Sequence, residues 1–442
     1  MLDITFALII LGAIMILGFI GNIIFNRTQI PSIVWLLVFG LIIGFILNVR
    51  NIDPSLLMTI SKFFAAVAIV IILFDGGINT DLYQLFRGAP RGLLLSISAF
   101  SLSILGAMTM VVLLSATILP SIPLENSIIV GVVLGAMVGG TSSPIVIPLA
   151  CKLRNLQERT KMVLSIESII TDPLCIVVVL AAFYMITFAG EFNISVGARN
   201  LVVTFSVGAV MGLVLGLIWL PIMSRVRKEQ FSYVATLAVV FLVYSLTTVL
   251  VGVEEGGEGA GAIACLVFGL VLGNGKKVLK MINYYGGEGY EMEEETKHFH
   301  SLISFIIRTF FFVYLGMVVS FQNTAFIIIG IVVLIILLGV RYLAILITTY
   351  RGNFEEDDKQ TMIVMMPRGL AAAILALNFG PGLIENLMPG MEGFYKDVAF
   401  VIILGTAIIC TIGVSIISFY EKKKNPNLDS KTIEKIIDEK SE

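Results

Sequence analysis

Charged residues are scarce in this chain: Asp, Glu, Lys and Arg together make up only 14% of its 442 residues. Hydrophobic residues make up 57%, and the mean hydropathy is +0.99. So few charges exclude a soluble globular protein, whose surface needs many more. Because an unpaired backbone group is costly in hydrocarbon, apolar runs of about 20 residues cross a bilayer only as helices. The composition therefore predicts an all-α polytopic membrane protein.

Soft metal ligands are scarce as well. The chain has two histidines and four cysteines, and no two cysteines have CxxC spacing. Cys151, Cys175, Cys265 and Cys410 lie in or beside apolar runs, where a buried cysteine behaves as a small hydrophobic residue. This pattern argues against a disulfide framework and against a metal centre of Cys and His. We expect no cofactor and no nucleic-acid partner.

Long apolar runs, by contrast, are abundant, and counting them between charged and turn-forming segments predicts about thirteen transmembrane helices. Two of the runs, at roughly 32–48 and 258–273, are short for a span. The predicted spans cover roughly residues 4–25, 32–48, 56–74, 93–119, 127–150, 160–188, 198–222, 231–251, 258–273, 299–321, 325–349, 360–379 and 397–420.

Basic residues fall mainly on one side of these spans. When the lysine run at 422–424 is placed inside, the outside loops hold only Arg50, Arg199 and Lys396. Basic loops stay in the cytoplasm, so we predict a multi-pass protein of the cell membrane with an external N-terminus and a cytoplasmic C-terminus. An even number of spans would place basic loops on both faces.

Two spans are interrupted by glycine and proline. The fifth contains Gly-Gly-Thr-Ser-Ser-Pro at 139–144 followed by Pro148, and the twelfth contains Pro-Arg-Gly at 367–369 and ends with Gly-Pro-Gly at 380–382. Such residues break the helical hydrogen-bond ladder, which is tolerated at membrane depth where the freed groups line a cavity. Kinks or close helix packing are the alternative explanation.

The two interrupted spans occupy corresponding places in two halves of opposite direction. This arrangement predicts inverted repeats with the binding site at the paired broken helices. We predict one transmembrane domain over about 1–420, with repeat one at about 1–190, a linking helix at about 198–222 and repeat two at about 231–420. A short cytoplasmic tail follows at 421–442.

The sixth span holds two carboxylates, Glu167 and Asp172. A charge at membrane depth costs a few kcal/mol and marks an ion or proton pathway by default. Five residues apart on a helix, the two side chains point about 140° from each other and so face different partners. Pro173 has no N–H, which leaves the carbonyl of Ile169 free one turn below Asp172.

Asp172 lies among oxygen-bearing side chains that suit a small monovalent cation. The predicted ligands are Asp172, Ser168 and Thr171 of the sixth span with Thr141 and Ser142 of the broken fifth span. The ion expected at Asp172 is Na⁺ or K⁺.

Glu167 needs a counter-charge if it is to stay ionised in the membrane. The intramembrane cations are Lys62, Arg308, Arg341 and Arg368, of which Arg341 and Arg368 lie nearest the broken twelfth span. An ion pair that only fixes helix packing is the alternative role for these arginines.

These motifs together carry a resemblance that covers nearly the whole chain, from about 4 to 420. The ordered set consists of Gly-Gly-Thr-Ser-Ser-Pro, then Glu-Ser-Ile-Ile-Thr-Asp-Pro at 167–173, then Pro-Arg-Gly-Leu followed by alanines. Asp75 in Phe-Asp-Gly-Gly, and Arg308 before three phenylalanines, also fit. The chain resembles the monovalent cation:proton antiporter superfamily and is most similar to its sodium/proton exchanger branch with NhaP-like proteins.

The resemblance implies the sodium/proton antiporter fold, with two crossed discontinuous helices, and a homodimer whose core bundle moves against a dimerisation domain. It implies that cation and proton compete for one aspartate, here Asp172, and that Glu167 and Arg341 form a structural ion pair. Arg308, Arg368 and Asp75 would support the site. The activity implied is exchange of Na⁺, and by extension Li⁺, for H⁺, with no enzyme chemistry.

The chain departs from that branch twice. It has Thr171-Asp172 where relatives have Asn-Asp, and Thr141-Ser142 where many have Thr-Asp. With one carboxylate left to trade charge, electroneutral 1:1 exchange is expected, and the less charged site leaves a K⁺/H⁺ antiporter as the alternative. An intramembrane aspartyl protease pairing Asp75 with Asp172, and a passive channel, are more distant alternatives.

Overall fold

The protein is described here from a computed structural model. It covers residues 2–28, 30–49, 55–80, 90–118, 123–153, 156–187, 194–226, 232–252, 257–281, 294–319, 321, 323–389, 391 and 393–424. Within these ranges the chain forms seventeen helices and no strand. The predicted tail lies outside the described residues from 425 onward. An all-α chain was predicted from composition, and the structure confirms it.

The helices fall into two groups by their contacts. The first group, which we call the scaffold, is built around α10 packed on α3, α8 and α9, and α12 packed on α1 and α2. Its members are α1 (Leu2–Thr28), α2 (Ser32–Val49), α3 (Ser55–Ile78), α8 (Ile194–Val226), α9 (Ser232–Val251), α10 (Gly257–Gly273), α11 (Gly275–Met281) and α12 (Glu294–Val318).

The second group, which we call the core, is built around α4 packed on α5, α7 and α13, and α17 packed on α13 and α15. Its members are α4 (Pro90–Ile118), α5 (Leu124–Met137), α6 (Ser143–Lys152), α7 (Glu158–Thr187), α13 (Thr324–Thr349), α14 (Glu356–Val364), α15 (Leu370–Asn378), α16 (Gly380–Leu387) and α17 (Phe394–Lys424). Contacts between the groups are fewer and run mainly through α3, α7, α12 and α15.

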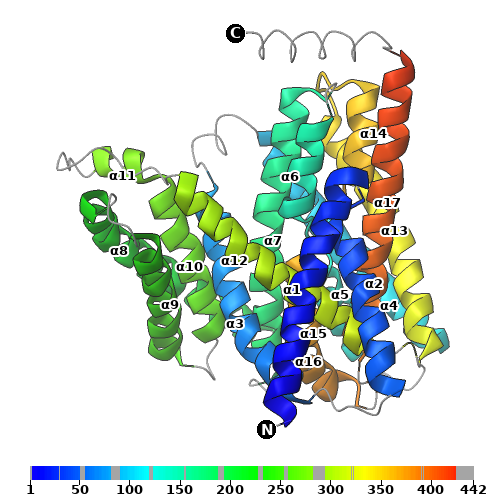
Figure 1. Cartoon of the computed structure of the whole chain (residues 1–442), viewed down its shortest axis with the longest axis horizontal. Coiled ribbons are helices and arrows are strands. Elements are labelled where there is room, and N and C mark those ends of the chain that lie inside the picture. The colour runs from blue at the N-terminus through cyan, green and yellow to red at the C-terminus, as the bar shows by residue number, and fades with distance from the viewer. Residues whose placement is uncertain are drawn as a thin grey trace.

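Each predicted span corresponds to a described helix or to a pair of helices. Eight helices are long and apolar enough to cross a membrane, namely α1, α3, α4, α7, α8, α9, α13 and α17, and α2, α5, α10 and α12 are shorter apolar helices. The two interrupted spans are the pairs α5–α6 and α14–α15. Figure 1 shows α8, α9 and α10 on one side of the molecule and α4, α13 and α17 on the other, with α3 and α7 between them.

Small residues bring the scaffold helices together. On α8, Gly208 and Gly212 lie so close to α10 that a Cβ on either would collide with the carbonyl oxygen of Ala260 or Ala264. Glycine one turn apart lets helix backbones approach closely, which is how transmembrane helices associate without a hydrophobic driving force. The scaffold helices are therefore tightly packed around α10, whereas the scaffold and the core make fewer contacts with each other.

Candidate functional site

The two broken helices cross at their unwound segments. Residues 138–142 separate α5 from α6, and residues 365–369 separate α14 from α15. Where they cross, the backbone N–H of Ser142 donates to the carbonyl of Pro367 at 2.8 Å. A Cβ on Gly369 would lie 3.0 Å from that of Ser142, so a larger residue there would press on Ser142 at the crossing. The structure thus contains the two crossed discontinuous helices that the sequence predicts.

Arg368 fixes this crossing. Its Nη1 donates to the carbonyls of Gly139 at 2.8 Å and Gly140 at 2.9 Å, and its backbone N–H donates to Thr406 Oγ1 at 3.1 Å. The side chain is buried. Carbonyls beyond a helix end have no intrahelical partner, so the guanidinium satisfies two carbonyls of the unwound segment that follows α5. Arg368 therefore bonds to the backbone of the other broken helix, and the side chain that bonds to Glu167 is a different arginine.

Glu167 bonds to Arg341 on α13. Arg341 Nη1 donates to Glu167 Oε1, and the two side chains are 2% and 1% exposed. The same guanidinium donates through Nε to the carbonyl of Met362 and through Nη2 to that of Met365, each at 2.9 Å. Arg341 therefore ties α7, α13 and the end of α14 together. This geometry suits a pair that holds the core in shape.

Asp172 faces a different direction, as the five-residue spacing predicts. Its side chain is buried on α7, and Ser143 Oγ, at the start of α6, lies 3.4 Å from Asp172 Oδ2. The same hydroxyl lies 3.3 Å from the carbonyl of Ser168, so one proton serves two acceptors. No arginine or lysine is bonded to Asp172 among the described residues. Among the described residues, the carboxylate is therefore bonded to neutral groups of Ser143 and to no fixed cation.

The predicted ligands behave differently from one another. Ser168 Oγ donates back to the carbonyls of Leu164 and Ser165 on its own helix, at 3.0 and 3.2 Å. Thr171 Oγ1 accepts from the backbone N–H of Thr141 at 3.1 Å. The Thr171 hydroxyl therefore links α7 to the unwound segment, whereas the Ser168 hydroxyl stays within α7.

Thr141 Oγ1 is buried and has no hydrogen-bond partner in the described part of the chain. Ser142 is buried beside Gly369 at the crossing. Ser143, which the ligand prediction omitted, is the residue that reaches Asp172. It lies in the same Gly-Gly-Thr-Ser-Ser-Pro run as Thr141 and Ser142, and the ligand set itself stays a prediction.

A cavity of about 560 Å³ leads to Asp172 between core and scaffold. Its wall includes Asp75, whose Oδ1 accepts from Asn79 Nδ2 at 2.7 Å, and it includes Arg308. Asn79 and Pro144 are exposed, so the cavity opens to the surface. The lining comes from α3, α6, α7, α12 and the start of α15 and consists of Ile71, Ile72, Asp75, Gly76, Asn79, Ser143, Pro144, Ile147, Pro148, Ser165, Ile169, Asp172, Pro173, Ser304, Ile307, Arg308 and Leu370. Lys62, a further intramembrane cation in the sequence, is exposed and lies outside this lining.

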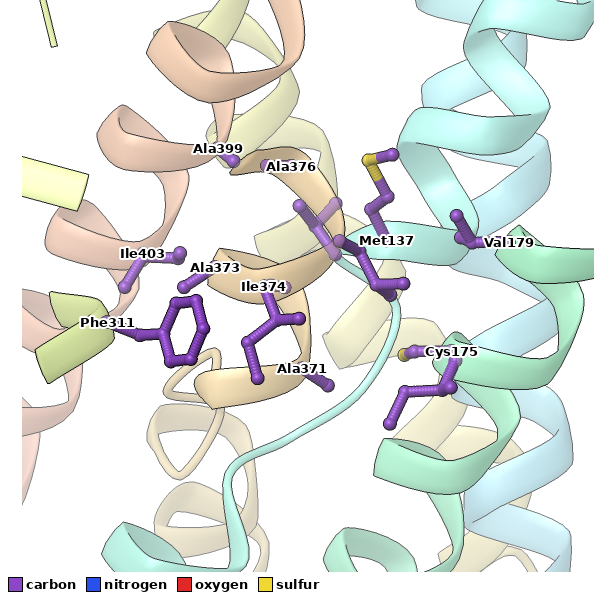
Figure 2. Close-up of a cluster of buried hydrophobic side chains, with 14 of the residues drawn as sticks. Met137, Cys175, Val179, Phe311, Ala371, Ala373, Ile374, Ala376, Ala399 and Ile403 are labelled. Carbon is purple, nitrogen blue, oxygen red and sulfur yellow. The ribbon is translucent and has the colours of Figure 1, made fainter. Parts of the chain in front are cut away.

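The other side of the crossing is apolar. Figure 2 shows Ile374 and Ala373 of α15 beside Phe311 of α12, and Met137 at the end of α5 with Cys175 and Val179 of α7 nearby. All of these side chains are buried. The described side chains on this side of the crossing therefore form an apolar packed region, whereas the cavity brings polar groups to Asp172 from the side of α3 and α12.

Comparison with known proteins agrees with this architecture. Residues 12–422 match the transmembrane sodium/hydrogen exchanger family. Two proteins of Methanocaldococcus jannaschii are similar: Na⁺/H⁺ antiporter 1, 27% identical over 431 residues and covering 93% of each chain, and probable Na⁺/H⁺ antiporter 2, 25% identical over 411 residues and covering 89% of each.

The fold has a solved counterpart. The structure of the sodium proton antiporter MjNhaP1 from the same organism, at pH 8, superposes with a TM-score of 0.74 at 23% sequence identity, over 94% of this chain and 99% of that one. The family match spans both broken helices and both carboxylates of α7. The chain belongs to the transmembrane sodium/hydrogen exchanger family.

Proposed function

We propose that this protein is a secondary active antiporter that exchanges Na⁺ for H⁺, with Asp172 as the group that carries either ion. The observation that supports this most is the contrast along α7: Glu167 is bonded to Arg341, whereas Asp172, among the described residues, is bonded only to neutral groups of Ser143 and faces a cavity that opens to the surface. A buried carboxylate without a fixed cation binds a mobile one, and a proton satisfies the same need. The family is one of transporters, which agrees with this role and not with an intramembrane protease.

The charges in the cavity suit a single monovalent ion. Two carboxylates, Asp75 and Asp172, and one guanidinium, Arg308, lie in the lining, so the cavity carries one net negative charge when Asp172 is ionised. Binding of Na⁺ or of H⁺ brings that charge to zero. Each loaded form then crosses the apolar part of the protein without a net charge, and the empty charged form is held back by the cost of desolvation.

The ends of the broken helices strengthen the site. The N-terminus of α6 begins at Ser143, next to Asp172, and the positive end of a helix dipole favours a carboxylate there. The hydroxyl and backbone oxygens nearby are the hard ligands that Na⁺ prefers. Half-helices that meet at the middle of the membrane recur in secondary transporters for this reason.

The assembly and the orientation belong to the same proposal. We infer a homodimer from the resemblance to this family, in which the core moves and the scaffold stays fixed in the bilayer, and the sparser contacts between the two groups support such a movement. The excess of basic residues in alternate loops supports an external N-terminus and a cytoplasmic C-terminus in the cell membrane. The cavity, which lies at the end where α3 ends and α7 begins, then opens to the cytoplasm.

Cation-induced dequenching of a pH dye in proteoliposomes tests the function. Wild type is expected to respond to Na⁺ and Li⁺, while Asp172→Asn gives the trace of empty liposomes. Glu356→Gln, a substitution at an exposed residue far from the cavity lining, is the matched control and should respond as wild type. A response to K⁺ alone would contradict Na⁺ exchange, and a flux driven by one gradient without the other ion would indicate a channel.

The stoichiometry has its own test. One carboxylate that trades one cation for one proton moves no net charge, so we expect electroneutral 1:1 exchange. An imposed K⁺/valinomycin potential should leave the equilibrium pH gradient unchanged. A gradient that follows the potential would show that a second titrating group takes part, and Asp75 would then be the first residue to substitute.

A further inference from the structure

The interface between core and scaffold is open at one end and closed at the other. The cavity is lined by α3, α6, α7 and α12 near Asp75, where Gly76 still lies against Pro173 of α7, whereas Ser61 in the N-terminal half of α3 bonds to the end of α15. Ser61 lies roughly 20 Å along α3 from Asp75, since a helix rises 1.5 Å per residue. The cavity thus reaches Asp172 from the end of the interface at which α3 ends.

The closed end contains a polar contact between the two groups. Ser61 of α3 donates through Oγ to Oδ1 of Asn378 at 3.3 Å. Asn378 is the last residue of α15. Asn378 Nδ2 donates to the carbonyl of Ile374 in its own helix at 3.1 Å, which orients the amide so that its oxygen faces Ser61. Ser61 is 2% exposed. Asn378 is the only polar side chain of α15, whose other residues are Leu, Ala and Ile.

Aromatic packing surrounds this contact. Phe64, one turn along α3 from Ser61, stacks on Phe310 of α12 with ring centroids 4.9 Å apart, and Phe310 stacks on Tyr314 at 5.7 Å. The next residue, Phe311, lies beside α15 (Figure 2). These rings join α3 to α12 within the scaffold and present an apolar wall to α15. Apolar surfaces part and rejoin without a specific partner, but a buried hydrogen bond is lost when its two halves separate.

We propose that the Ser61–Asn378 hydrogen bond is a latch that holds the end of the core–scaffold interface opposite the cavity closed, and that it must break before Asp172 is exposed at that end. This inference rests on the proposed function. The latch sets the balance between the two access states and leaves ion binding itself unchanged, because both residues lie far from the cavity lining. Ser61 and Asn378 are therefore positioning residues of the transport cycle.

Locking the latch gives the first test. The double variant Ser61→Cys/Asn378→Cys is made with Cys151→Ser, since Cys151 is the exposed cysteine among the four. Oxidation, or bridging with a short bis-methanethiosulfonate, should join the two cysteines and reduce Na⁺-driven exchange to the level of empty liposomes. Dithiothreitol should restore it, and the two single-cysteine variants should be insensitive to either reagent.

A measurement of Na⁺ binding distinguishes failure of the latch from failure of the proposed function. The cross-linked protein should keep the Na⁺-induced rise in unfolding temperature, because the cavity still leads to Asp172. Failure of the cysteines to join, or a cross-linked protein that exchanges at the wild-type rate, would overturn the latch. A wild type that shows neither exchange nor a Na⁺-induced rise would instead overturn the proposed function.

Weakening the latch gives the second test. Ser61→Ala and Asn378→Ala remove a hydrogen bond between uncharged groups, which shifts a two-state equilibrium by about 2- to 10-fold. KM for Na⁺ measured from the side opposite the cavity should fall by about that factor, while KM from the cavity side is unchanged or higher. Ser61→Thr keeps the hydroxyl and should restore the wild-type values. Two KM values that move together, with a lower kcat, would show that the contact only supports the fold.

Discussion

The two faces of α7 each carry a buried carboxylate, and the two carboxylates differ in how their charge is compensated. On one face Glu167 is paired with Arg341, which also satisfies two carbonyls at the end of α14. On the other face Asp172 is bonded only to the hydroxyl and the backbone N–H of Ser143 among the described residues, and it faces an open cavity. Both carboxylates are buried in the same helix, so burial alone does not identify the working group. What distinguishes them is whether the counter-charge is part of the protein or has to come from solution.

The largest expected effect comes from removing the unpaired charge. Asp172→Asn keeps the shape of the side chain but holds neither a proton nor a cation, so exchange and the Na⁺-induced rise in unfolding temperature should both disappear. The unfolding temperature without Na⁺ should stay the same or rise, because a buried charge without a partner is costly. Dye dequenching and thermal unfolding in detergent measure the two effects. A variant that unfolds at a markedly lower temperature would show that Asp172 is structural.

Breaking the ion pair of Glu167 and Arg341 should have the reverse effect: stability is lost and Na⁺ binding is kept. Arg341→Met leaves Glu167 buried without its partner, and loss of one member of a buried ion pair costs about 3–5 kcal/mol. We expect a lower unfolding temperature and a lower yield of folded protein, with Na⁺ binding retained by whatever fraction folds. The double variant Glu167→Gln/Arg341→Met removes both charges and should recover part of the loss. If Arg341→Met folds normally and only transport fails, the pair belongs to the transport machinery.

Substitution of Arg368 should have an intermediate effect, because its guanidinium donates to backbone carbonyls and, among the described residues, is not paired with a carboxylate. Arg368→Gln removes charge-assisted hydrogen bonds to Gly139 and Gly140, each worth about 1.5–3 kcal/mol. In wild type the single nitrogen Nη1 donates to both carbonyls. Arg368→Lys keeps the charge and one such nitrogen, so it should lower the unfolding temperature less than Arg368→Gln. The order expected for unfolding temperature is wild type, then Arg368→Lys, then Arg368→Gln. Equal loss in the two variants would mean that the planar guanidinium, and not its charge, holds the crossing.

Much of this comparison was predictable from the sequence. Hydropathy predicted the spans, glycine and proline predicted the two broken helices, and helical spacing predicted that Glu167 and Asp172 face apart. Such features depend on local composition and on the 3.6-residue repeat, which a sequence displays directly. The resemblance to antiporters added the pairing of Glu167 with Arg341, a contact that the structure contains. The functional roles of these residues stay predictions until the variants are measured.

The missed contacts have a common cause. Ser143 as the neighbour of Asp172, Arg368 on the carbonyls of Gly139 and Gly140, and Asn378 on Ser61 all depend on where one segment meets another far along the chain. An unwound segment has no periodicity, so its sequence does not say which of its side chains points to which neighbour. Within Gly-Gly-Thr-Ser-Ser-Pro the sequence favoured Thr141 and Ser142, whereas the side chain nearest Asp172 in the fold is that of Ser143.

The smallest expected effect distinguishes the predicted ligands from the observed one. Ser143→Ala removes the hydroxyl that lies 3.4 Å from Asp172, and a net change of about 0.5–1.5 kcal/mol corresponds to a rise in KM for Na⁺ of about 2- to 10-fold with kcat unchanged. Ser168→Ala should have less effect on KM, because that hydroxyl already bonds to its own helix at 3.0 and 3.2 Å. Stopped-flow dequenching over a range of Na⁺ concentrations measures both variants against wild type. If Ser168→Ala raises KM more than Ser143→Ala does, the ligand set predicted from the sequence is the better one, and α7 itself, with little help from α6, supplies the oxygens that surround the ion.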